Sequence, residues 1–163
     1  MSERPFIPDW FWEIIDSTRP DLLALALRLE QLSRKDLLRY SHFYQVASDA
    51  VCHAWEGPFI DDEIGHLSED STEDLTDWIV SGGKESWLYA TEPDVDLVAL
   101  FLLSVQAERG EIDEPPQWTL DVTLEDRQGY QTPNGLAIPI FYERHNSNNE
   151  DFYEALEKLR AEM

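Results

Sequence analysis

The sequence predicts a mainly helical fold, a bundle of six or seven helices with a small C-terminal β-hairpin and a closing helix. Apolar residues recur at helical spacing through most of the chain before Gly110, glycine and proline separate these segments, and a period of two appears only after that glycine. The 163 residues have the length of one domain. We expect residues 10–110 to form its helical core and residues 111–163 to form an extension with the hairpin and the last helix.

Three helices are predicted in the first part of the chain. The first opens with Pro8 and Asp9, which suit a first helical turn, and residues 18–20 break it. The second spans residues 21–32, where leucines share one face. The third follows a cap at Ser33 and runs to about residue 55, which makes it the longest.

The middle of the chain is predicted to hold shorter helices. Residues 59–67 form one, and Ser71 caps the next, which glycines 82 and 83 end. Residues 84–90 add a further helical piece.

The most apolar helix is predicted to start at Pro93 and to run to about Arg109. Its centre, residues 97–103, is apolar on every side. A helix of that kind is normally surrounded by other elements, so we expect it to form the centre of the fold.

The pattern changes to a period of two after a proline-rich linker. Residues 118–124 alternate apolar and polar side chains, and Leu136, Ile138, Ile140 and Tyr142 repeat the period of two after a proline-asparagine-glycine turn. These runs predict two strands of a hairpin, and Pro139 restricts the second to a sheet edge. Asn148 or Asn149 is expected to cap the closing amphipathic helix.

The charge of the chain is strongly negative. There are 34 acidic and 12 basic residues, a formal net charge of -22, although 42% of the residues are hydrophobic. Such a charge repels nucleic acid and anionic membranes and favours a basic protein partner or bound cations. Adaptation of the source cell to high salt is the alternative explanation.

Cysteine content and the chain start predict a soluble, cytoplasmic protein. Cys52 is the only cysteine, so no internal disulfide is expected. The first residues lack a basic stretch followed by an apolar one, and the longest apolar run, residues 97–103, is too short to cross a bilayer.

Three segments carry a resemblance to a known family. Residues 11–15 hold an early Phe-Trp pair, residues 68–84 an acidic cap and a Trp-Ile helix core with a Gly-Lys stop, and residues 92–94 a Pro-Asp helix start. Their order and spacing resemble the bacterial DUF4240 family over about residues 10–105. The resemblance implies a helical domain of unknown function and carries no activity to this chain. Thr76 stands where that family usually has an arginine, which removes a potential anion site.

Motifs for catalysis or cofactor binding are incomplete. Glu63 and His66 have the Glu-x-x-His spacing of di-iron bundles, but one such motif is no full ligand set. Residues 83–84 read as a glycine helix stop and not as a phosphate loop, because the other positions of that loop do not fit. Cys52 and His53 point about 100° apart on a helix, so they form no nucleophile-base pair. We therefore expect no catalytic residue, metal or cofactor.

The segment from residue 61 to residue 77 is the main candidate for a binding surface. It holds eight acids and no Lys or Arg. Glu73 and Asp74 are expected in the first turn of a helix, where they stabilise its positive end. The other acids are either a solvated face or a docking surface for a basic partner. The predicted partner-binding residues are Asp61, Asp62, Glu63, Glu69, Asp70 and Asp77.

The resulting hypothesis is a non-enzymatic, acidic protein-binding module. One form of it is an immunity or antitoxin protein that covers the phosphate-attracting site of a basic toxin. The alternatives are a small-ligand-binding or enzymatic domain of unknown activity, whose polar groups come from scattered positions, and a regulatory module of a larger assembly.

Overall fold

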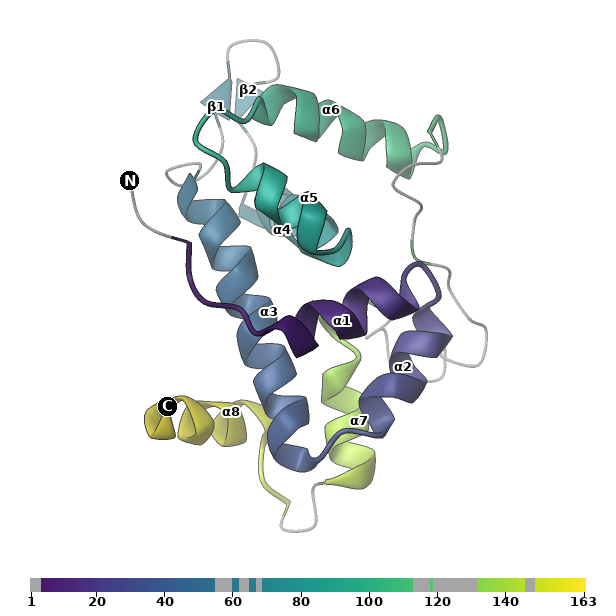
Figure 1. Ribbon diagram of the computed structural model, residues 1–163, viewed down its shortest axis with the longest axis vertical. Helices are drawn as coiled ribbons and strands as arrows, with labels where there is room; N and C mark the ends of the chain where they lie inside the picture. The colour runs from purple at the N-terminus through teal and green to yellow at the C-terminus, as the bar shows by residue number, and fades with distance from the viewer. Residues whose placement is uncertain are drawn as a thin grey trace.

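The computed structural model describes residues 4–54, 60–61, 65–66, 69–112, 118, 132–145 and 149–163. The fold is mainly helical, as predicted, and the described residues hold eight helices and one pair of two-residue strands (Figure 1). The elements are α1 (Asp9–Thr18), α2 (Leu22–Glu30), α3 (Arg34–Ala54), β1 (Ile60–Asp61), β2 (Gly65–His66), α4 (Glu69–Ser81), α5 (Lys84–Ala90), α6 (Leu97–Glu108), α7 (Ala137–Arg144) and α8 (Phe152–Glu162).

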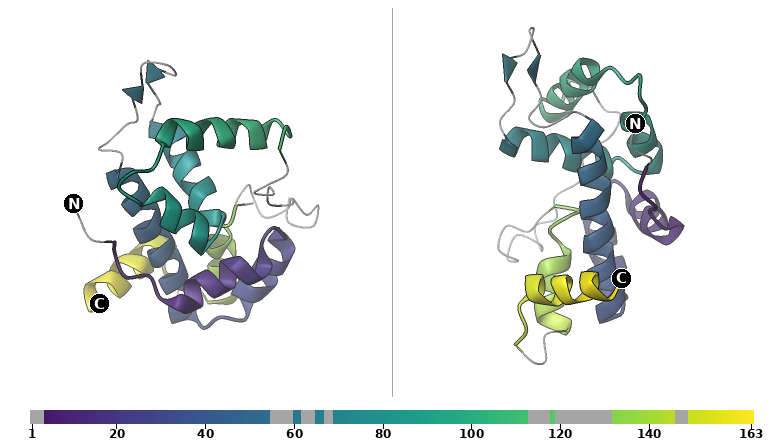
Figure 2. Two further views of the ribbon diagram at one scale, coloured as in Figure 1. Left: turned by 45° about the horizontal axis from the view of Figure 1, so that its top comes forward. Right: turned by 90° about the vertical axis from the view of Figure 1, so that its left-hand side faces the viewer.

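The long helix α3 is the central element of the fold. It packs against α4, α5, α7 and α8, so helices from both halves of the chain meet on it. Figure 2 shows α4, α5 and α6 gathered around one end of α3 and α2, α7 and α8 around the other. Buried side chains recur along α3 at helical spacing on a wide face, from Leu37 to Val51, which explains how one helix serves so many partners.

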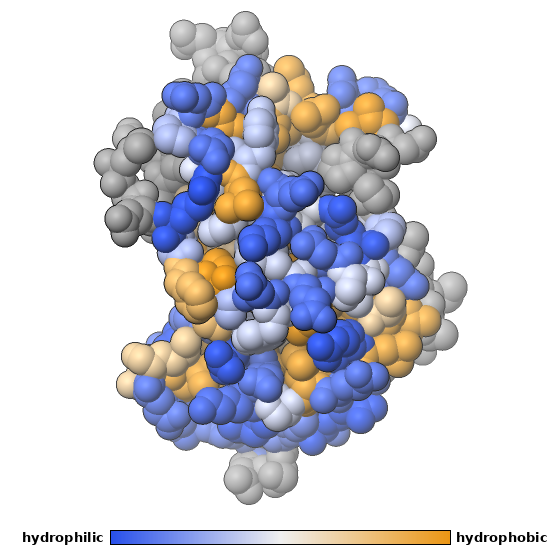
Figure 3. Space-filling view, viewed as in Figure 1, coloured by the Kyte–Doolittle hydropathy of each residue, from blue (hydrophilic) through white to orange (hydrophobic). Residues whose placement is uncertain are grey.

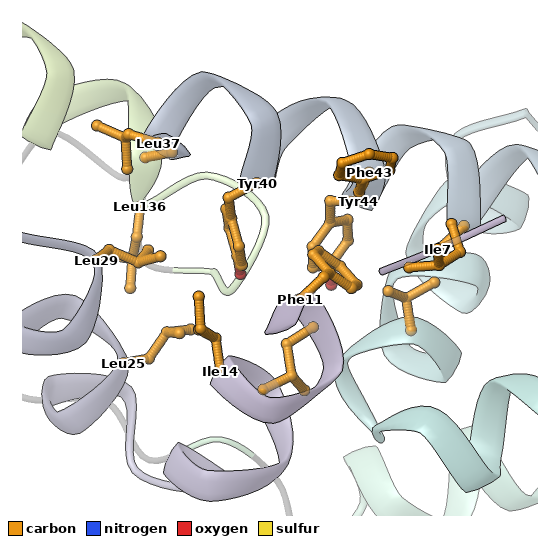
Figure 4. Close-up of a cluster of buried hydrophobic side chains, with 14 of the residues drawn as sticks. Ile7, Phe11, Ile14, Leu25, Leu29, Leu37, Tyr40, Phe43, Tyr44 and Leu136 are labelled. Atoms are coloured by element: carbon orange, nitrogen blue, oxygen red, sulfur yellow. The ribbon is translucent and has the colours of Figure 1, made fainter. Parts of the chain in front are cut away.

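The core lies where α3 meets α1, α2 and the start of α7. Tyr40 and Tyr44 of α3 point toward Phe11 and Ile14 of α1, and Leu37 lies one turn before Tyr40, near the start of α7 (Figure 4). All five side chains are at most 1% exposed. The rings of Phe11 and Tyr40 have centroids 5.3 Å apart, and those of Phe11 and Tyr44 are 6.0 Å apart in an edge-on arrangement, which favours aromatic pairs beyond the area they bury.

A tryptophan pair joins α1 to α5. The rings of Trp12 and Trp87 have centroids 5.3 Å apart, and both side chains are buried. The indole N–H of Trp87 donates a hydrogen bond of 3.0 Å to the backbone carbonyl of Ala47 in α3. This bond satisfies the polar end of a buried indole and fixes α5 against the central helix.

The first three helices and α5 agree with the predicted segments, and capping residues explain several of their ends. The Asp21 carboxylate accepts hydrogen bonds from the backbone of α2, and the Ser33 hydroxyl accepts one from the Asp36 N–H. Other starts differ from prediction. The helix α6 begins after Asp96, whose carboxylate accepts from the Ala99 N–H, and α8 begins after Asp151. In both cases an aspartate provides the cap.

The predicted second strand, residues 136–142, is wrong, because these residues belong to α7 and the turn before it. Leu136, Ala137, Ile140 and Phe141 are fully buried, which is helical spacing, whereas a strand would bury every second residue. Pro139 lies in the first turn of α7, where a backbone N–H has no helical partner, so proline is tolerated. The first predicted strand lies outside the described residues except for Trp118.

The predicted helix over residues 59–67 is also wrong in the parts that the structure describes. Residues 60–61 and 65–66 form β1 and β2, which pair antiparallel with Ile60 opposite His66 and Asp61 opposite Gly65. Gly65 lies in β2, and a glycine at this position weakens a helix. The remaining positions lie outside the described residues.

The most apolar helix, α6, does not occupy the centre of the fold. It packs against α4 at one end of the molecule, and Leu100 is buried at 7% exposure, whereas Leu102 and Leu103 are 46% and 39% exposed. Apolar content on every side therefore does not make this helix central. Among the described helices, none combines the length and the apolar character that crossing a membrane requires.

Candidate functional site

The acidic residues of α4 occupy two different turns. The helix begins at Glu69, two residues before the predicted cap at Ser71, so Glu69 and Asp70 stand at its positive end. Glu73 and Asp74 then lie one turn further on, with exposed side chains. We expected Glu73 and Asp74 in the first turn of this helix, at the positive end of its dipole. Glu69 and Asp70 occupy that turn instead.

The other predicted docking acids are distributed around β1 and the end of α4. The backbone of Asp61 belongs to β1 and pairs with that of Gly65. Asp62 and Glu63 lie outside the described residues. Figures 1 and 2 show β1 and β2 at the same end of the molecule as α6, with α4 leading away from them.

Asp77 differs from Glu73 and Asp74 of the same helix because its side chain is partly buried. It lies at the junction of α3, α4 and the turn that precedes α7. The Ser48 hydroxyl of α3 donates a hydrogen bond of 3.4 Å to Asp77 Oδ1, and the Asn134 side chain also forms a hydrogen bond with this carboxylate. Asp77 thus faces the interior, which differs from the exposed position that a docking residue needs.

The environment of Asp77 shifts its protonation. Burial is the main cause that raises the pKa of Asp77 to about 6, and the nearby charges of Asp74 and Glu73 act in the same direction. The hydrogen bonds of Ser48 and Asn134 oppose this by lowering the pKa. A carboxyl group with this pKa changes its charge in the range from weakly acidic to neutral pH.

Two buried tyrosines complete the junction around Asp77. The Tyr44 hydroxyl donates to the backbone carbonyl of Asp77 at 3.1 Å, and the Tyr40 hydroxyl donates to the carbonyl of Pro133 at 2.7 Å. Burial first, and then the charge of Asp77, raises the pKa of both phenols. The arrangement ties α4 and the turn at Pro133 to α3 through polar bonds.

Sequence reasoning missed this junction. No sequence motif singles out Tyr40, Ser48 or Asn134. One signal was available, since Asp77 stands three residues before the fully buried Val80 and so lies beside the buried face of α4.

Basic side chains of the chain are largely engaged with its own acids. At least seven of the twelve form ion pairs, so the outward field of the molecule remains strongly negative. Glu150, for example, accepts from both Arg34 and Lys158, and Arg144 reaches Glu30 across 3.3 Å. The paired bases are Arg4, Arg34, Arg39, Lys84, Arg144, Lys158 and Arg160.

Residues 83–84 form a helix stop and not a phosphate loop. Gly83 has φ of +100°, a conformation that favours glycine, and its N–H bonds the Val80 carbonyl at the end of α4. The Asp16 carboxylate lies against Gly83, where an added Cβ would be only 2.1 Å from Asp16 Oδ1. A carboxylate of the chain therefore occupies the side of the glycine where an anion would approach.

The other candidate motifs do not assemble in the described part of the chain. Gly65 and His66 form a strand, so the helical spacing behind the Glu-x-x-His motif does not apply there, and Glu63 lies outside the described residues. Cys52 and His53 are consecutive residues of α3. Within the described residues, no three His, Cys, Asp or Glu side chains are grouped so that they could share a metal ion.

Comparison of the chain with family models, curated proteins and solved structures finds no match. The resemblance to the DUF4240 family thus stays a prediction.

Proposed function

We propose that this chain is a non-enzymatic, strongly acidic module that binds a basic protein partner. The observation that carries the proposal is the charge: a net charge of -22, with most basic side chains engaged in internal ion pairs. Such a molecule attracts cationic surfaces and accelerates their encounter. An immunity or antitoxin protein that covers the cationic site of a toxin is one form of this activity.

The proposed docking surface is the acidic run at the end of the molecule formed by β1, β2 and α4. It comprises Asp61, Asp62, Glu63, Glu69 and Asp70 from the sequence analysis, together with the exposed Glu73 and Asp74. Asp77 is left out because its carboxylate is partly buried and hydrogen-bonded by Ser48. Glu69 and Asp70 also stabilise the start of α4, so Glu73 and Asp74 are the better residues for a test.

The test begins with affinity capture of a partner from a lysate of the source cell, followed by association kinetics. We expect a basic protein whose association rate falls steeply as salt is added. The Glu73→Lys/Asp74→Lys variant should slow association by roughly tenfold. Glu13→Lys/Glu162→Lys is the matched control, since it changes two exposed acids on α1 and α8 by the same charge. Equal rates for all three proteins at every salt concentration would contradict the proposal.

A further inference from the structure

The outer side of α6 presents apolar side chains to solvent. Leu102 and Leu103 are 46% and 39% exposed, while Leu100 faces α4 and is buried. Ala99, Leu102, Leu103 and Gln106 follow the i, i+3, i+4, i+7 spacing of one helical face. We call these four residues the outer face of α6. In the space-filling view, several hydrophobic areas lie over this helix at the top of the molecule (Figure 3).

Two adjacent exposed leucines are unusual on this surface. The other large apolar side chains that are exposed among the described residues stand singly along the chain, such as Leu27 of α2 at 52%. Scattered apolar residues are normal on a protein surface, whereas apolar residues gathered on one face and surrounded by polar ones mark an interaction site. The outer face of α6 belongs with the gathered apolar residues that mark an interaction site.

The surroundings of the outer face are acidic. Asp94 and Asp96 are exposed before the start of α6, and Glu111 is exposed after its end. The helix α4, on which α6 packs, carries two further exposed acids, Glu73 and Asp74. Residues 94–111 contain a single base, Arg109, against four acids. A ligand for this face therefore needs apolar groups at the centre and positive charges at both ends.

We propose that the outer face of α6 binds a basic amphipathic helix of the partner protein. The inference rests on the proposed function, and it adds the kind of segment through which the partner binds. Leucines of the incoming helix cover Leu102 and Leu103, and its Lys or Arg residues meet the flanking acids, as in other complexes where a helix lies on an apolar surface. A second copy of this chain is the less favourable occupant, because two molecules of charge -22 repel each other.

The probe is a synthetic peptide of leucine and lysine with the leucines at helical spacing, and its control is a scrambled peptide of the same composition. We expect the amphipathic peptide to gain helicity on binding and to bind at least about tenfold more tightly than the scrambled one. Leu102→Asp/Leu103→Asp should remove most of this difference. The added aspartates make the surface more acidic, so weaker binding reports lost apolar contact. Leu27→Asp, at an exposed leucine elsewhere, should bind as the wild type does.

The possible outcomes separate the two proposals. Equal, salt-sensitive binding of both peptides would overturn the role of α6 and leave the proposed function in place. Binding of neither peptide, even at low salt, would count against both. Sedimentation of the wild type as a dimer that the Leu102→Asp/Leu103→Asp variant dissociates would assign the face to a second copy instead. Thermal unfolding of each variant shows whether the fold is kept.

Discussion

The helices α3 and α6 occupy positions opposite to those that their apolar content suggests. The more polar helix, α3, is central, and the more apolar helix, α6, lies at one end of the molecule. α3 carries charged and polar residues along its length, yet Leu37, Tyr40 and Tyr44 are at most 1% exposed and the helix packs against helices from both halves of the chain. α6 is apolar through its centre, yet it packs against α4 at one end of the molecule and leaves Leu102 and Leu103 exposed.

The difference shows that a helix is central when several of its faces pack against other helices. High hydropathy alone does not make it central. The polar residues of α3 stand beside its apolar ones in a pattern that matches its neighbours. In α6 the apolar Leu102 and Leu103 stay exposed beside the contact with α4. Exposed apolar residues of that kind are an expected feature of a binding surface.

Leu37→Ala tests the central position of α3 and should have the largest effect. Its side chain is fully buried, so the substitution leaves a cavity and should lower the free energy of unfolding by about 2–5 kcal/mol. Urea denaturation monitored by circular dichroism measures this change. A loss below about 1 kcal/mol would mean that the core around α3 relaxes freely and that the comparison with α6 does not hold.

Leu100→Ala makes the same change at the one side chain of α6 that is clearly buried among those described. We expect a loss of about 2 kcal/mol, at the low end for such substitutions, because a site at the edge of the fold can collapse more easily. The same urea titration gives the value. A loss greater than that of Leu37→Ala would place α6 at the centre after all.

Asp77→Asn tests the polar junction that joins α3 to α4. Because burial raises the pKa of Asp77 from 3.8 to about 6, the folded protein holds a proton that the unfolded chain has lost between these values. The stabilisation by this group is complete below pH 3.8 and is lost as the pH rises through 6. At pH 8 the variant should be more stable than the wild type by about 1–2 kcal/mol, and at pH 3.5 the two should be alike.

Thermal melts across this pH range, with Glu13→Gln as the control for a lost surface charge, measure the difference. A stability difference between Asp77→Asn and the wild type that does not change with pH would show that folding does not shift the pKa of Asp77.

Leu103→Gln should have the smallest effect on stability. An exposed side chain loses little when it becomes polar, so the free energy of unfolding should change by less than about 0.5 kcal/mol. Differential scanning calorimetry beside Leu100→Ala checks this. A drop as large as that of Leu100→Ala would mean that both sides of α6 are packed against the protein.

Helices with a clear apolar stripe were predictable, because a period of 3.6 has one interpretation. Residues 136–142 were not, since nearly every position there is apolar and both periods fit. Burial against other helices decides between helix and strand here, and a local sequence pattern does not show this burial. The buried residues are Leu136, Ala137, Ile140 and Phe141. Asp77 is a similar case. Its hydrogen-bond partners Ser48 and Asn134 are distant in sequence, so an acidic run alone predicted a solvated or docking residue.

The contact between the tilted indoles of Trp12 and Trp87 has a practical consequence. Indole rings with centroids 5.3 Å apart couple their excited states, which adds a circular dichroism component that depends on contact between α1 and α5. The two residues come from distant parts of the sequence, so this component reports tertiary structure and is lost in a Trp12→Phe variant. The protein therefore carries its own optical probe, and a partner that separates α1 from α5 would be detected without any added label.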